Sequence, residues 1–246
     1  MQKPAQSKGE KDTFTSCVFQ QKKIMTLQVV KETIYTKNFQ AVLGQTTDAR
    51  LKELRQKAFD YFTENGFPTP KNEEWKYTNV APIINSEFQF AAGQEWKYEI
   101  DYNLLGQFDY QRNGFAALNL ALCNFLFVRI PKDTVHPNPI KFDFALHGNV
   151  EIFPRVIFVV EAGSKATIIE TYESDSKSFT NAAMQIFLED NAHLTHYRVQ
   201  KESPEAFHIG TTEVILRRGS LYNSTNISLG GQLSRHDVHV KFTAEG

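Results

Sequence analysis

The sequence predicts a mainly β protein: a right-handed parallel β-helix (a solenoid of stacked strand turns) preceded by a small N-terminal α-helical region. Short runs of β-branched or aromatic residues, bounded by Pro, Gly, Asn and Ser, dominate from residue 115 onward, as at residues 125–130, 156–160 and 214–216. No helix of ordinary length fits between these runs. The pattern therefore excludes a standard βαβ fold, in which helical crossovers separate parallel strands.

A repeated turn indicates the solenoid. Turn-then-strand units at residues 162–166, 190–194 and 218–222 align, and Gly163, Asn191, Gly219 and Gly246 mark the repeat at intervals of 28, 28 and 27 residues. Gly or Asn at a recurring position suits a left-handed turn, and such a period holds two short strands with their corners. An antiparallel sandwich also has regularly spaced strands. Recurrence of one turn chemistry in one register favours the solenoid.

Four parts are predicted along the chain. Residues 1–24 are polar without periodic apolar positions, so we expect a disordered extension, and Met25 competes with Met1 as the natural start. Residues 25–85 form the N-terminal helical region, residues 86–114 a connection with one or two short strands, and residues 115–246 the β-helix core. Because no polar capping segment follows the last marker, we expect this core to be incomplete and the chain to be truncated, naturally or as an artefact.

An amphipathic helix is predicted within the helical region. Thr47 or Asp48 caps its start, and it ends at Asn65-Gly66, where a left-handed residue is followed by prolines. A weaker helix is expected near residues 33–43. The apolar positions of the main helix recur at helical spacing, and they are Leu51, Leu54, Ala58, Tyr61 and Phe62.

Composition narrows the classes of function. The formal net charge is -1 at pH 7, so no uniform field attracts nucleic acid or an anionic membrane, and no apolar run approaches the roughly 20 residues that span a bilayer. Cys17 and Cys123 are the only cysteines, which is typical of a reducing cytoplasm. Cys123 lies among leucines and is interpreted as a buried, inert thiol. Iron–sulfur clusters need about four thiolates, so we expect this fragment to bind no cofactor.

Two histidine pairs are candidate metal ligands. His193 and His196 are three residues apart in a predicted strand and therefore point to opposite faces, as do His236 and His239. Asp237 and His239 share a face, but a pair binds a metal only weakly. We interpret these residues as surface polar residues on the solenoid wall and predict no metal site.

Three carboxylates raise an alternative function. β-Helices host carbohydrate-cleaving enzymes, and Glu161, Glu170 and Glu173 resemble the paired acids of a polysaccharide lyase or hydrolase. Nothing in the sequence fixes two of them at a catalytic separation. The chain also has no GxxxxGK[ST] phosphate loop, no GxSxG elbow and no GxGxxG after a strand. No catalytic residue and no ATPase activity are predicted.

A dense motif follows the main helix. Residues 70–78 contain two acids, two bases and two aromatics. We interpret them as a junction in which Trp75 and Tyr77 wedge the helical region against the first strands while the charges stay in water. A binding site is the alternative.

Residues 68–78 resemble the "P-T-x-K-x-E-x-W-K-Y-T" signature of the SufB/SufD family of iron–sulfur cluster assembly proteins. Further similar stretches follow in family order, at residues 115–119, 139–140, 154–156, 166–170, 180–181, 190–200, 229–231 and 234–235. The motif and the scarcity of cysteine are more similar to SufD than to SufB. The chain departs from the family pattern at residues 86–114, which are short, and at residues 123–124, where an Asp-Gly turn is expected. The matched residues, interpreted as structural, are Glu73, Trp75, Lys76, Tyr77, Asn119, Pro154, Arg155, Glu170, Asn181, Gly230, Gly231 and Arg235.

The resemblance implies a role in a complex. Members pair as SufB with SufD and recruit the SufC ATPase, and the whole complex handles the iron–sulfur cluster. We therefore expect a non-catalytic subunit in the cytoplasm, whose partners are a SufB-like paralogue and a SufC-like ATPase, with no nucleic acid and no membrane. The family's partner-interface segments correspond to positions beyond Gly246, so no interface residue is assigned.

Overall fold

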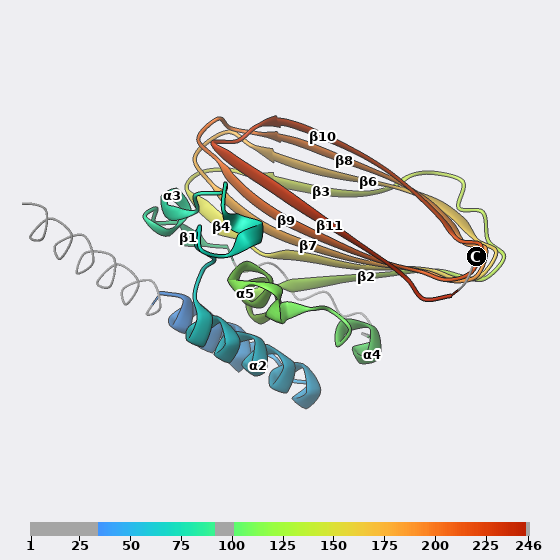
Figure 1. Cartoon of the computed structure of the whole chain (residues 1–246), viewed down its shortest axis with the longest axis horizontal. Coiled ribbons are helices and arrows are strands. Elements are labelled where there is room, and N and C mark those ends of the chain that lie inside the picture. Colours follow the sequence, from blue (N-terminus) through green and yellow to red (C-terminus); the bar gives the residue numbers. More distant parts are fainter. Residues whose placement is uncertain (1–33, 92–100, 245–246) are drawn as a thin grey trace, which may run out of the picture.

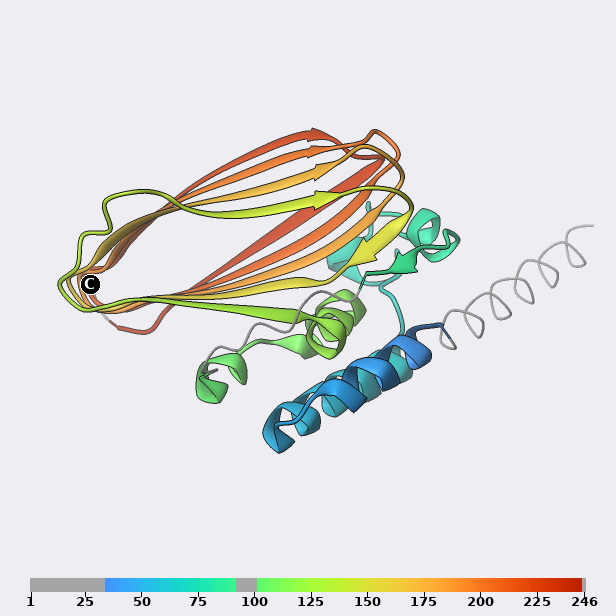
Figure 2. The ribbon, with the colours of Figure 1, turned by 180° about the vertical axis from the view of Figure 1, so that it is seen from behind.

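The computed structural model describes residues 34–91 and 101–244. A parallel β-solenoid forms the main body, and the helices lie along one side of it (Figures 1 and 2). The predicted disordered extension and the marker Gly246 lie outside the described residues.

Two parallel sheets face each other across the solenoid interior. Sheet A contains β2 (Asn124–Ile130), β5 (Pro154–Val160), β7 (Phe179–Leu188), β9 (Phe207–Leu216) and β11 (Leu233–Phe242), with β4 (Val150–Ile152) beside β7 and β1 (Gln89–Phe90) beside β4. Sheet B contains β3 (Ile140–Leu146), β6 (Lys165–Ser174), β8 (His193–Glu202) and β10 (Leu221–Gly230). From β2 onward the chain passes repeatedly from one sheet to the other, and the strand pairs are parallel. The predicted parallel solenoid is confirmed, and an antiparallel sandwich is excluded.

Successive turns stack in register. On sheet B, Lys165 pairs with His193 and His193 with Leu221, a step of 28 residues each time. On sheet A, Phe179 pairs with Phe207 at the same step, and Phe207 then pairs with Leu233. A side chain on one strand therefore lies directly over its equivalent on the strand before it.

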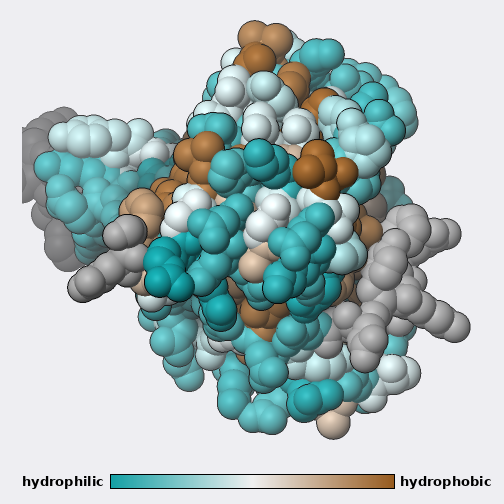
Figure 3. Space-filling model, turned by 90° about the vertical axis from the view of Figure 1, so that its right-hand side faces the viewer, coloured by the Kyte–Doolittle hydropathy of each residue, from teal (hydrophilic) through white to brown (hydrophobic). Residues whose placement is uncertain are grey.

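The marker residues form a column of left-handed turns. Gly163, Asn191 and Gly219 have φ angles of 72°, 57° and 65°, and Asp133, which the repeat analysis did not identify, has 55°. Consecutive turns are hydrogen bonded, because the amide of Gly163 donates to the carbonyl of Asp190 at 2.9 Å and that of Asn191 to Arg218 at 2.9 Å. Seen from this end, the surface is mostly hydrophilic with scattered apolar patches (Figure 3).

The helical cap, residues 34–84, begins with a helix over residues 34–45 and continues with α2 (Ala49–Asn65), η1 (Glu73–Trp75) and α3 (Ala81–Ile84). Asp48 caps α2, since its side chain accepts from the amides of Arg50 at 2.8 Å and Leu51 at 3.0 Å. The helix ends at Gly66, whose φ is 65°. Both predicted helices are confirmed.

The predicted start of the β-helix core at residue 115 was wrong. Residues 114–122 form a helix, α5 (Gly114–Leu122), capped by the side chain of Asn113, which accepts from the amide of Ala116 at 3.0 Å. All nine residues of α5 are buried, so no polar face reveals a helical period in the sequence. Two further short elements, α4 (Tyr102–Leu105) and η2 (Tyr110–Arg112), precede it in the segment expected to be a connection.

Apolar side chains form two main cores. One fills the solenoid interior, where alternate residues of both sheets meet, and includes Phe158, Ile168 and Ile186. The other lies between the outer face of sheet A and the helices, and includes Phe62 and Phe115. As a result β7 is buried along its whole length.

The turn column makes a testable prediction. A Cβ atom on Gly219 would lie 2.4 Å from Asn191 Oδ1, whereas one on Gly148, whose φ is 79°, would meet nothing within 4 Å. Gly148→Ala should lower the free energy of unfolding by about 1–2 kcal/mol, the cost of a left-handed non-glycine residue. Gly219→Ala should lower it by about twice as much, because overpacking adds to the strain. Urea unfolding of both variants measures the difference, and equal losses would show that the stacked turns do not constrain each other.

Candidate functional site

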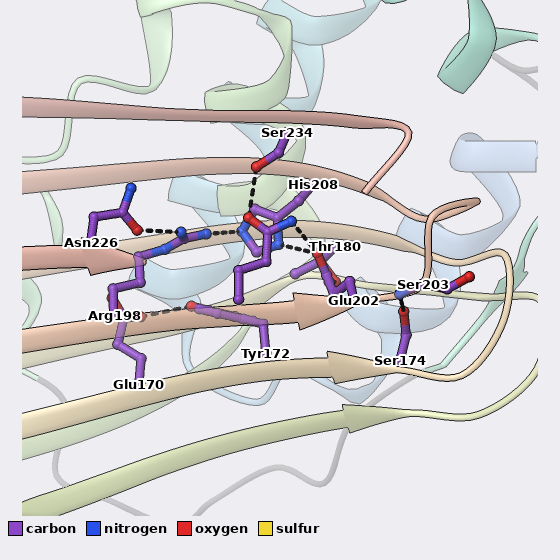
Figure 4. Close-up of polar contacts among 11 residues, drawn as sticks. Glu170, Tyr172, Ser174, Thr180, Arg198, Glu202, Ser203, His208, Asn226 and Ser234 are labelled. Atoms are coloured by element: carbon purple, nitrogen blue, oxygen red, sulfur yellow. Dashed lines mark hydrogen bonds and ion pairs between the residues drawn. The ribbon is translucent and has the colours of Figure 1, made fainter. Parts of the chain in front are cut away.

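The solenoid interior becomes polar from one turn to the next. On sheet B the inward positions Ile140, Phe142 and Phe144 of β3 stack through β6 onto His196, Arg198 and Gln200 of β8. These three side chains and Glu202 are buried. Charged groups removed from water need partners, and the β8 residues find them on neighbouring strands of both sheets (Figure 4).

Arg198 is the centre of the interior network. Its guanidinium donates to Asn226 Oδ1 at 2.9 Å and to Nε2 of His208. A guanidinium only donates, so Nε2 of His208 accepts and the imidazole proton is on Nδ1. That Nδ1 donates to Glu202 Oε2 at 3.0 Å. One chain of hydrogen bonds therefore joins β10, β8 and β9.

Glu202 gathers three donors. Besides His208, it accepts from Thr180 Oγ1 at 2.8 Å and from Gln200 Nε2 at 2.9 Å. Gln200 Oε1 in turn accepts from Ser234 Oγ at 2.6 Å. The carboxylate is thus held by side chains of β7, β8 and β9.

A second branch contains the matched residue Glu170. Its Oε1 lies 2.7 Å from His196 Nε2, and its Oε2 accepts from Tyr172 at 2.7 Å. His196 Nδ1 lies 2.8 Å from the hydroxyl of Tyr222 on β10. The Arg198 guanidinium lies 5.0 Å from the Tyr172 ring centroid, within cation–π range, and so connects the two branches.

Burial and these partners shift several pKa values. Burial alone would raise the pKa of Glu170, but the hydrogen bond and charge of His196, with Arg198 and Tyr172, lower it to about 2. Glu202 behaves similarly, since His208 and Thr180 outweigh its burial and lower its pKa. Burial and the Arg198 charge lower the pKa of His208. The carboxylates are therefore ionised and His208 is neutral at pH 7.

Gly210 provides the space for this network. A Cβ atom there would lie 3.1 Å from the ring of His236, 3.4 Å from Nε2 of His208 and 3.5 Å from the guanidinium of Arg198. His236 Nε2 and Thr212 Oγ1 form a hydrogen bond of 2.9 Å. Its burial, together with the Arg198 charge, lowers its pKa to about 3.

The interior network was not predicted. His196 and His236 were interpreted as surface residues, which is wrong. The polar residues of β8 point inward while Tyr197 points out, and the ring of His236 lies in the network beside Gly210 and Thr212. The available signal was the spacing of His196, Arg198, Gln200 and Glu202 at every second position. That spacing places them on one face but does not say whether the face is inside.

The carboxylates considered for sugar cleavage are separated by the solenoid wall. Glu170 is inside. Glu161 bonds Arg129 at 3.0 Å and the amide of Lys132 at 2.9 Å, and Glu173 pairs with Lys201 at 3.7 Å with half of its side chain exposed. Glu170 therefore cannot face the same substrate bond as either of the others.

The motif after α2 contacts the last described turn. The Trp75 ring stacks on the Phe115 ring with 5.4 Å between their centroids. The Arg235 guanidinium lies 4.1 Å from the centroid of the Trp75 ring. Arg235, on the outer face of β11, donates to the Glu74 carbonyl at 2.7 Å. The predicted wedge against the first strands was wrong, because Trp75 contacts β11 and α5. Tyr77, expected to share the wedge, is 92% exposed, with Lys76 5.5 Å from its ring centroid.

Four other matched residues attach α5 to sheet A. Asn119 donates to the carbonyls of Pro154 at 3.2 Å and Asn181 at 2.6 Å, and it accepts from Arg155 at 2.7 Å. Asn181 donates to the Phe115 carbonyl at 2.9 Å. Burial lowers the pKa of Arg155 to about 10, which leaves it charged at pH 7. These contacts fix the helix against the outer face of the sheet.

The remaining matched residues lie at turns and on the cap surface. A Cβ on Gly230 would lie 2.0 Å from the carbonyl oxygen of Glu202, so the turn after β10 packs against the end of β8. Gly231 follows it, beside the side chain of Gln200. Glu73 is exposed in η1.

Asp237 and His239 of β11, the candidate metal-ligand pair, are each hydrogen bonded to an arginine. Asp237 accepts from Arg235 at 2.9 Å, and His239 Nδ1 accepts from Arg112 at 2.6 Å. Cys123 is buried as predicted, and burial raises its pKa. Across residues 34–91 and 101–244, no three His, Cys, Asp or Glu side chains are grouped so that they could hold a metal ion.

Comparisons with family models and with known proteins agree on one family. Residues 29–109 match the model of the SufBD protein N-terminal region, and residues 144–246 match that of the SUF system FeS cluster assembly, SufBD core domain. An iron–sulfur cluster assembly SufBD family protein of Synechocystis sp. is 26% identical over 93% of this chain and 63% of its own length. The iron–sulfur cluster assembly protein SufD of Escherichia coli is 22% identical over 77% of this chain and 56% of its own length. The chloroplastic protein ABCI7 of Arabidopsis thaliana is 38% identical over 36% of this chain and 19% of its own length.

The chain thus spans between 19% and 63% of the length of these relatives. No helix in the described part of the chain has the length and apolar character needed to cross a membrane.

Replacing Arg198 tests the interior network. Arg198→Leu leaves Glu170 and Glu202 buried without their cation, so the free energy of unfolding should fall by about 3–5 kcal/mol. Arg218→Leu is the matched control, because Arg218 is exposed and only 3.5 Å from Asp190, and it should change stability by less than about 0.5 kcal/mol. Urea unfolding measures both. Similar small losses would mean that the network does not stabilise the solenoid.

Acid should unfold the protein through the same groups. The pKa values of His208 and His236 are below the ordinary histidine value, so their neutral forms stabilise the fold above about pH 6.5, and this contribution is lost as pH falls, for His236 down to about 3. The lowered pKa values of Glu170 and Glu202 act in the same direction at still lower pH. We expect stability to fall steadily between pH 6.5 and 3, and less steeply in His236→Gln. A pH series of thermal unfolding checks this, and an unchanged slope in the variant would contradict it.

Proposed function

Because the chain belongs to the SufB/SufD family of iron–sulfur cluster assembly proteins, we propose that it is a non-catalytic, SufD-like subunit of a SUF assembly complex. In this role it pairs with a SufB-like paralogue and recruits a SufC-like ATPase. The proposal also places it in the cytoplasm, with the iron–sulfur cluster as the cargo of the complex and no resident cofactor in this chain.

The observation that carries the proposal is the order of the two family matches on the fold. The N-terminal model covers the helical cap and the segment before α5, and the core model covers the solenoid from within β3 onward. A contact between these two parts uses residues of the family motifs, because the Arg235 guanidinium lies 4.1 Å from the Trp75 ring centroid. The resemblance therefore extends to how the parts are joined.

A structural rather than catalytic role is supported by the chemistry of the interior. Glu170, Glu202 and His208 are buried, and each is hydrogen bonded to other side chains. A general acid or base must reach its substrate within hydrogen-bond distance, and these groups are committed to each other. They stabilise stacked turns, which suits a subunit that offers rigid surfaces to partners.

Affinity purification tests this function. We expect the protein, tagged near its N-terminus at its own locus in the source cells so that any sequence after residue 246 is kept, to recover a SufB-like protein and a SufC-like ATPase in fixed proportion. Phe158→Asp, which places a charge in the interior core, should unfold the solenoid and recover neither partner. Exposed Lys52→Glu on α2 is the folded control and should recover both.

Two results would overturn the proposal. One is recovery of neither partner by the folded protein expressed from its own locus. The other is release of reducing or unsaturated sugar ends from polysaccharides by the purified chain, which would favour the carbohydrate-active alternative.

A further inference from the structure

A polar cleft lies between the helical cap and the segment that leads into α5. Its volume is about 360 Å³, and it is lined by the end of α2, by η1 and η2, and by the start of α5. Trp75 from η1 and Arg112 from η2 both line it. Neither the interior network nor membership of an assembly complex accounts for a cleft at this position.

Three buried N–H groups at this junction have no acceptor among the described residues. They are Nε1 of Trp75, Nε of Arg112 and Nε2 of His239. His239 carries its proton on Nε2 because its Nδ1 accepts from Arg112. The Trp75 side chain is only 2% exposed. Buried donors without acceptors are rare in folded proteins. Two of the three, on Trp75 and Arg112, belong to residues that line the cleft, which marks the cleft as a place for an acceptor from outside the chain.

The surrounding charges define the kind of acceptor. Arg112 is already paired with Glu213 at 3.1 Å and with Asp109 at 3.6 Å. The exposed charges that line the cleft are the carboxylates of Glu73 and Glu74. An anion would be repelled by these acids, whereas a neutral backbone carbonyl accepts hydrogen bonds without that cost.

We propose that this cleft binds an extended, basic polypeptide segment of a partner protein. Its backbone carbonyls accept from Trp75 and Arg112, and its lysine or arginine side chains pair with Glu73 and Glu74. Tyr77, almost fully exposed two residues after Trp75, supplies an aromatic surface for the aliphatic parts of those side chains. The inference stands on the cleft alone and does not depend on which complex the protein joins.

The indole N–H of Trp75 reports directly on this contact. The chain has two tryptophans, and Trp96→Phe assigns their two indole signals in a proton–nitrogen NMR spectrum of the full chain. Titration with an acetylated, amidated peptide of alternating Lys and Ala should shift the Trp75 signal in a saturable way. The same peptide with Glu in place of Lys, and free lysine, should leave the signal in place.

Matched variants separate the cleft from general surface charge. Glu73→Gln combined with Glu74→Gln should weaken binding of the basic peptide about three- to tenfold, the scale of two surface ion pairs. Glu53→Gln with Glu64→Gln, both exposed on α2, should leave the affinity unchanged. The substituted side chains are exposed in both pairs, so the folded NMR spectrum should be kept.

Three results would overturn the proposal. They are no saturable shift with the basic peptide up to millimolar concentration, an equal response to the acidic peptide, and equal weakening by the two double variants. Each leaves the affinity purification result untouched, so the two proposals fail separately.

Discussion

The fold depends on one constraint: every turn of the solenoid stacks directly on its neighbour, in parallel and in register. The column of left-handed turns at Asp133, Gly163, Asn191 and Gly219 enforces this, because each turn is hydrogen bonded to the next. Once the register is fixed, each inward position becomes a column of stacked side chains. The environment of an interior residue is therefore set by the residues one repeat before and after it, more than by its neighbours in sequence.

Stacking explains how buried charges are tolerated in the interior. Phe142, Glu170, Arg198 and Asn226 occupy one column, so an acid and a base follow each other on adjacent strands in a space of low polarity, where paired charges interact strongly. Residues from the facing sheet complete the network, and Glu202 joins the two sheets through His208 and Thr180. Outside the wall, α5 and the cap contact sheet A through side chains that match family motifs. The result is a solenoid whose buried interior charges are hydrogen bonded to one another.

Much of this fold could be predicted from the sequence because its signals are local. Gly163, Asn191 and Gly219 reveal a turn that needs a left-handed residue, and Asp48 and Gly66 mark the ends of α2 by their capping chemistry. Other features depend on contacts that a single sequence does not encode. Helix α5 is buried on all sides because it lies between α2 and sheet A. Strand β8 reverses the usual rule, since its Arg198 and Glu202 side chains point inward. Trp75 was recognised as a junction residue, but its partner Arg235 is 160 residues away along the chain, and only the fold brings them together.

Disulfide trapping in solution tests the stacking most directly. Thr167 and Thr195 are paired in register on the outer face of sheet B, so their Cα atoms lie within the roughly 4.4–6.8 Å that a disulfide spans. In a chain with its own cysteines replaced, Thr167→Cys with Thr195→Cys should cross-link on mild oxidation, as detected by mass spectrometry of the joined peptides. Thr167→Cys with Tyr197→Cys, displaced by two residues along the strand, should not. Equal cross-linking of the two pairs, or efficient cross-linking of the displaced pair alone, would contradict the register on which this account rests.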